Sequence, residues 1–117
     1  MVSQTTFTVT QRDTLADRVA DLIADLGDTP DAIAYHLAKA GISGRRADAT
    51  CCPIANYLLR AEPSFDLVDV YGEVIDVSTR TGHTTSLPAP AAINEFVKVF
   101  DFENGYPDLI SHAEVTR

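Results

Sequence analysis

The residues best suited to chemistry are two adjacent cysteines, Cys51 and Cys52, which stand before Pro53 and a short apolar segment. Proline fits the first position of a helix, so Cys52 is expected to be the cap residue of a helix that stops before Pro63. There its sulfur would lie among unpaired backbone N–H groups, whose partial positive charge stabilises a thiolate. One interpretation is therefore a reactive thiol at Cys52. The other is that Cys52 packs as a small apolar residue, which is how free cysteine usually behaves.

No other group near the cysteines completes a known catalytic pattern. Arg45 and Arg46 form the only dense positive charge in the chain, and they could hold an anion at the same helix start. The sequence lacks a Cys-x-x-Cys motif, and no second pair of Cys or His has the spacing of a zinc site. We therefore predict no metal and no cofactor and favour a non-enzymatic function. A Cys52-dependent enzyme or thiol sensor remains the alternative.

Length and charge narrow the class of protein further. The 117 residues predict a single domain over 1–117, with frayed ends at 1–4 and 112–117. The net charge of −8 disfavours direct binding to nucleic acid or to an anionic membrane, and it favours a basic partner protein. A homodimer is left open. Two adjacent cysteines do not make a disulfide framework, so the cytoplasm is the expected compartment.

A row of aspartates in the first predicted helix is the main candidate for partner binding. Thr10 or Asp13 is expected to begin this helix, which ends at Gly27. Its apolar stripe consists of Leu15, Val19, Leu22 and Leu26. Its opposite side carries a carboxylate at every fourth position, namely Asp13, Asp17, Asp21 and Asp25. The row is either an ordinary solvated face or a ladder of carboxylates for a basic partner.

The flanking segments predict how this helix is placed. Residues 5–10 alternate Phe7 and Val9 with threonines, which favours a short edge strand or a loose N-terminal arm. Thr29 and Pro30 mark the start of a second helix, which directs Ile33, Leu37 and Ala40 to the core. The short connection predicts that these two helices form an antiparallel pair.

The second half of the chain changes to strand periodicity. Alternating apolar residues over 68–70 and 75–77, with turns at 71–73 and 80–83, predict an antiparallel meander completed by residues 84–87. Its outer face carries four carboxylates, Asp66, Asp69, Glu73 and Asp76. A last helix follows Pro90, with an apolar stripe of Ile93, Phe96, Val97 and Phe100, and residues 106–110 are expected to fold back on the core. The fold class is therefore α+β. A helical pair, a short helix and a C-terminal helix pack on one face of a small three- to four-stranded sheet.

Several short phrases together carry a resemblance. They are Ala40-Gly41-Ile42-x-Gly44, Cys52-Pro53-Ile54-Ala55-x-Tyr57-Leu58, Leu87-Pro88, Phe96-Val97-x-x-Phe100-Asp101 and Gly105-Tyr106-Pro107-x-Leu109. This combination resembles small uncharacterised proteins of actinobacteria and their phages, over about residues 30–110. The resemblance implies no activity, cofactor or site. It does imply an accessory protein, and the acidic charge then suggests a modulator of a basic or nucleic-acid-binding host protein.

Overall fold

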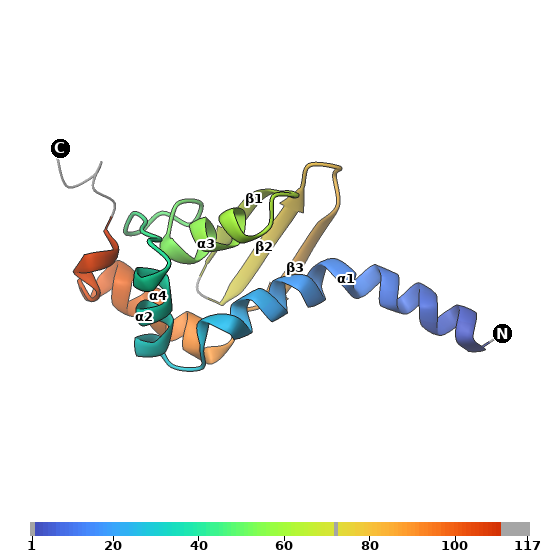
Figure 1. The fold of residues 1–117 in the computed structure, drawn as a ribbon, viewed down its shortest axis with the longest axis horizontal. Helices are drawn as coiled ribbons and strands as arrows, with labels where there is room; N and C mark the ends of the chain where they lie inside the picture. Colours follow the sequence, from blue (N-terminus) through green and yellow to red (C-terminus); the bar gives the residue numbers. More distant parts are fainter. Residues whose placement is uncertain (1, 72, 111–117) are drawn as a thin grey trace.

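The computed structural model describes residues 2–71 and 73–110, with side chains described from Thr14 onward, and it has the predicted α+β architecture. Figure 1 shows the arrangement of these elements. The helices of the described residues are α1 (Val2–Leu26), α2 (Pro30–Lys39), α3 (Pro53–Ala61), α4 (Ala91–Phe102) and a 3-10 turn, η1 (Pro107–Leu109). The strands are β1 (Phe65–Val70), β2 (Val74–Thr79) and β3 (Thr84–Pro88).

The first helix begins earlier than predicted. Because α1 starts at Val2, residues 5–10 are neither an edge strand nor a loose arm, and residues 2–4 are also helical. A strand needs a neighbour for its backbone N–H and C=O groups, whereas a helix pairs them internally. The sheet consists of β1, β2 and β3, and none of these pairs with residues 5–10. In Figure 1 the first part of α1 projects away from the rest of the protein. The predicted frayed end at 112–117 lies outside the described residues.

The sheet is the predicted antiparallel meander, in the order β1-β2-β3. Its inner face is formed by Val68, Val70, Ile75 and Val77, all of which are buried. The register between β1 and β2 shifts between Phe65 and Leu67. This irregularity allows Phe65 and Val68 both to be buried although three positions separate them. The outer face carries the like-charged pair Asp69 and Asp76 directly opposite each other.

The helices lie mainly on one side of the sheet, as predicted, but the first two do not form an antiparallel pair. α3 packs against β1 and α1 passes β3, whereas α2 packs chiefly against α4. Figure 1 shows α2 turning away from the line of α1 instead of running back beside it. At this corner the His36 Nδ1–H donates to the Leu26 carbonyl at 2.8 Å, which ties α2 to the end of α1. Ala40 is the exposed C-cap of α2 and not a core residue.

Local sequence signals explain the helix ends. Thr29 caps α2, with its Oγ1 accepting from the Ala32 N–H at 3.1 Å, and Pro30 occupies the first turn. Beyond α2, Gly41 adopts a φ of 73°, in the left-handed region that glycine enters without strain. These features stop α2 after ten residues and direct the chain into the segment 43–52.

Candidate functional site

Cys52 caps α3 as predicted, and it does so as a buried thiol. Its Sγ accepts from the Ala55 N–H at 3.4 Å, and only 3% of the residue is exposed. Burial raises the pKa of the Cys52 thiol from its ordinary value of 9.0 to about 11, although backbone N–H groups of Ala55 and Ile54 act in the opposite direction. The thiol is therefore neutral at physiological pH. Its position supports a packing role for Cys52 over the thiolate interpretation.

The segment before Cys52 is held tightly against neighbouring elements. Asn56 Nδ2 donates to the carbonyls of Ser43 and Cys51, at 2.8 and 3.1 Å. The Gly44 N–H donates to the Leu109 carbonyl at 2.8 Å. A Cβ on Gly44 would lie 2.4 Å from the backbone nitrogen of Pro53, so only glycine fits here without a backbone shift. The loop therefore packs directly on the start of α3.

The two arginines of this segment have different surroundings. The Arg46 guanidinium donates to the carbonyls of Phe100 and Gly105, and its carbon lies 4.6 Å from the centre of the Phe100 ring. It thus satisfies one carbonyl in the last turn of α4 and one in the segment just beyond the helix. Arg45 is exposed. Its charge helps to lower the pKa of Asp48, an effect that comes mainly from the hydrogen bond donated by Thr50. Arg46 is already engaged with α4, so the structure does not favour an anion site shared by both arginines.

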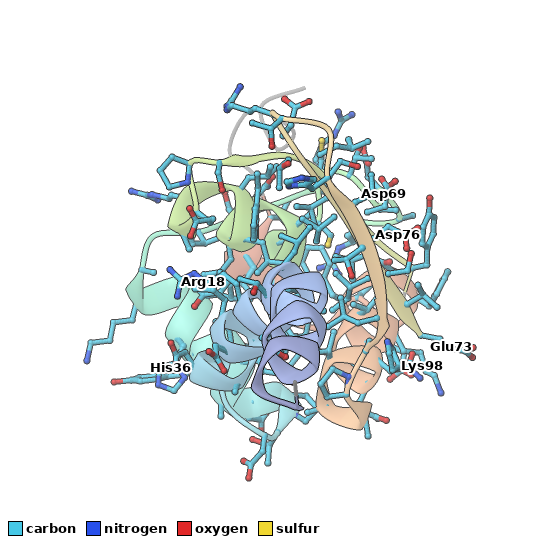
Figure 2. All side chains as sticks on the ribbon, turned by 90° about the vertical axis from the view of Figure 1, so that its right-hand side faces the viewer. Arg18, His36, Asp69, Glu73, Asp76 and Lys98 are labelled. Atoms are coloured by element: carbon cyan, nitrogen blue, oxygen red, sulfur yellow. The ribbon has the colours of Figure 1, made fainter. Side chains whose placement is uncertain are left out.

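The aspartate row of α1 lies in solvent wherever its side chains are described. Asp17, Asp21 and Asp25 are exposed, whereas the Asp13 side chain lies outside the described residues. The opposite side of α1 is buried through Val19, Leu22, Ile23 and Leu26, of which Ile23 was not predicted. Arg18 lies beside the row, and its Nε pairs with Glu62 at 3.0 Å. Figure 2 shows Arg18 on the side of α1 that faces α3. Over residues 14–71 and 73–110, Asp17, Asp21 and Asp25 make no ion pair.

A groove that the sequence analysis missed lies between the 47–49 loop, the β1–β2 connection and α4. It encloses about 500 Å³ and is open to solvent. Among its lining residues, Tyr71, Val74 and Phe102 remain 61%, 39% and 75% exposed. They are three of the five large apolar residues that the described part of the chain leaves exposed, so apolar surface is concentrated at this groove.

The sequence held a signal for this groove. Phe102 is two positions beyond Phe100, which places it about 200° around the helix from the buried stripe of α4. Val74 precedes the buried Ile75 and therefore points to the outer face of β2. Large apolar side chains at outward-facing positions indicate a binding surface when they gather, and only the fold brings these together.

The charged groups in and beside the groove are mostly acidic. Glu73 and Lys98 both line it, and Figure 2 shows them next to each other where the sheet meets α4. Asp101 is engaged, because its Oδ1 accepts from the Ala47 N–H at 2.9 Å. Asp69 and Asp76, both labelled in Figure 2, lie on the adjoining outer face of the sheet. They are close enough to raise the pKa of Tyr71, and Asp69 is the larger cause.

Among the described side chains, no three from His, Cys, Asp or Glu are grouped so that they could hold a metal ion. None of the described helices has the length and apolar character needed to cross a membrane. Comparison with protein families, curated proteins and solved structures found no match.

Proposed function

We propose that this protein is a non-enzymatic, acidic interaction protein that binds a basic partner through the carboxylates of α1. The observation that carries the proposal is the exposure of Asp17, Asp21 and Asp25 opposite the buried stripe of the helix. Each pair at four-residue spacing costs a helix a few tenths of a kcal/mol by like-charge repulsion. A cationic partner would offset that repulsion.

The spacing of the row supports a partner that normally handles nucleic acid. Four residues advance an α-helix by about 6 Å, which is comparable to the separation of phosphates along one nucleic-acid strand. Successive aspartates also turn gradually around the helix axis, as a surface that follows a groove requires. The carboxylates could therefore occupy a basic groove meant for DNA or RNA. The resemblance to actinobacterial and phage proteins supports a host protein, met in the cytoplasm, as this partner.

A capture experiment with matched variants tests the proposal. Wild-type protein and the double variant Asp17→Asn with Asp21→Asn are immobilised and exposed to an actinobacterial lysate, and bound proteins are eluted with increasing salt. We expect the wild type to retain a basic, nucleic-acid-binding protein that added DNA displaces. The double variant should release it at lower salt, because fewer charge contacts hold it.

The control is Asp108→Asn, which removes one exposed carboxylate from η1 and none from α1. It should leave the elution profile unchanged. A partner that binds the double variant with the wild-type affinity and salt response would show that the row is an ordinary solvated face.

A further inference from the structure

The groove beside α4 combines exposed apolar side chains with a defined concave shape. Phe102 and Tyr71 line a space of about 500 Å³ and are largely exposed, and Val74 adds a third apolar side chain. Exposing these rings to water is unfavourable, and burying an aromatic side chain at an interface contributes strongly to binding. The size of the groove suits one or two side chains of a partner segment better than a broad, flat contact.

The charges around the groove define the chemistry of that segment. Asp69 on β1 and Asp76 on β2 are directly opposite each other, and like charges in this position are destabilising. Ser86 Oγ donates to Asp76 Oδ1 at 2.5 Å, but a hydroxyl does not neutralise the pair. Glu73 adds a third carboxylate on the sheet side, whereas Lys98 stands on the α4 side. On α4 the positive charge of Lys98 is offset by Asp101, which also lines the groove, so the excess of carboxylates lies on the sheet side and a cation is favoured there.

We propose that the groove binds a short segment of a basic partner protein. An apolar side chain of the segment packs against Phe102, Val74 and Tyr71. An adjacent Lys or Arg is directed to Asp69 and Asp76. The proposal rests on the proposed function for the basic character of the partner, and it adds a second surface, separate from the aspartate row of α1.

A second copy of this chain is a less suitable occupant. The protein carries a net charge of −8. Two copies meeting at this face would bring together Glu73, which lines the groove, and Asp69 and Asp76, which lie on the adjoining strands. Such like-charge juxtaposition opposes association by several kcal/mol. Charge complementarity thus selects a basic segment over self-association.

Capped synthetic peptides test the proposal directly. The probe is a short peptide in which Leu alternates with Arg, and the matched peptides replace either Arg by Glu or Leu by Ser. Binding is followed by NMR titration of the isotope-labelled protein. We expect the Leu/Arg peptide alone to bind, with shifts at the amides of Tyr71, Val74 and Phe102.

Variants then assign the site. Phe102→Ser should weaken binding about tenfold, as truncation of a hot-spot aromatic does. Tyr35→Ser, which removes an exposed aromatic ring from α2, should leave it unchanged. Asp69→Asn should also weaken binding, whereas Asp108→Asn should not. Phe102 is exposed, so its replacement should preserve the fold, and the NMR spectrum of the free variant verifies this.

The outcomes separate this inference from the proposed function. The peptide could instead change the NMR signals of α1 alone, with an affinity that depends on Asp17→Asn and Asp21→Asn but not on Phe102→Ser. That result would reject binding in the groove and leave the proposed function standing. Equal binding of the Leu/Arg and Ser/Arg peptides, or no binding of either, would also overturn it. If the protein sediments as a dimer and Phe102→Ser converts it to a monomer, the occupant of the groove is a second copy of the chain and not a basic segment. If the peptide binds the groove but the capture experiment fails, the groove stands and only the role of the aspartate row as a binding surface is rejected.

Discussion

At the scale of single residues, Cys52 shows how two opposing effects on one thiol are decided. The helix start offers N–H groups that favour a thiolate, and this was the basis of the catalytic alternative. Burial disfavours the charged form, and it is the larger effect here, since the pKa of Cys52 rises to about 11. The proline and the cap position were readable in the sequence. The depth of burial was not, because it depends on the remote elements that cover the sulfur.

This raised pKa predicts how the stability of the protein depends on pH. Above the ordinary thiol pKa of 9.0 the unfolded chain loses the Cys52 proton, whereas the folded protein keeps it up to about pH 11. The stabilisation is thus complete below pH 9 and is lost as pH rises towards 11, by about 2 to 3 kcal/mol. Denaturant unfolding of wild type and Cys52→Ser should show a steeper loss for the wild type.

The variant itself controls for the other titrating groups, since both proteins share Cys51 and the tyrosines. We expect Cys52→Ser to fold with modest destabilisation near neutral pH, because serine is itself a good helix cap. Thiol reagents should react slowly with Cys52 in the folded protein. Parallel pH profiles for the two proteins, or rapid modification of Cys52 near pH 7, would show that the buried, neutral thiol is the wrong description.

At the scale of elements, the accuracy of the sequence predictions follows the range of the interactions. α2 and α3 were predicted well because Thr29-Pro30 and Cys52-Pro53 are local signals, read within one turn. The strands were predicted because alternation over 68–70 and 75–77 is also local. The start of α1 was missed since threonine and valine have only weak preferences, which the absence of a strand neighbour overrides.

The placement of elements depends on distant contacts and was predicted less well. The direction of α2 follows from its packing on α4, far along the chain, and from the hydrogen bond of His36 to Leu26. The α4 groove joins the 47–49 loop, the β1–β2 connection and Phe102, which no local pattern connects. The aspartate row, in contrast, is periodic within one helix, so its exposure could be predicted directly from the sequence.

The inward face of the sheet gives a sharp test of the element assignments. Ile75 is fully buried on β2, so Ile75→Ala should lower the free energy of unfolding by about 2 to 5 kcal/mol through lost burial and a residual cavity. Its neighbour Val74 points outward, and Val74→Ala should cost about 0.5 kcal/mol or less. Chemical denaturation measures both. A cost below about 1 kcal/mol for Ile75→Ala would mean that the two faces of β2 have been exchanged.

At the scale of the whole molecule, the excess of acidic groups dominates the electrostatics. The chain has 17 Asp and Glu against nine Lys and Arg. The ion pairs formed by the described residues are Arg18–Glu62, which is partly exposed, and Arg80–Asp66, which is largely exposed. Pairs near the surface contribute little. We therefore expect repulsion among the remaining carboxylates to outweigh these pairs, since the compact protein carries a net charge of −8. The same excess that limits stability is what would attract a basic partner.

This balance predicts that added salt stabilises the free protein. Raising the ionic strength from about 0.01 M to about 0.15 M shortens the screening length from about 30 Å to about 8 Å, which weakens repulsion across the molecule. We expect the free energy of unfolding to rise by about 0.5 to 1 kcal/mol, as relief of several like-charge contacts would give. The double variant Asp17→Asn with Asp21→Asn should be as stable as the wild type or slightly more so at low salt, and it should gain less from added salt. Urea unfolding, which adds no ions, measures both proteins at each ionic strength. A fall in wild-type stability with salt would mean that the two ion pairs outweigh the repulsion, and that the acidic surface is already balanced without a partner.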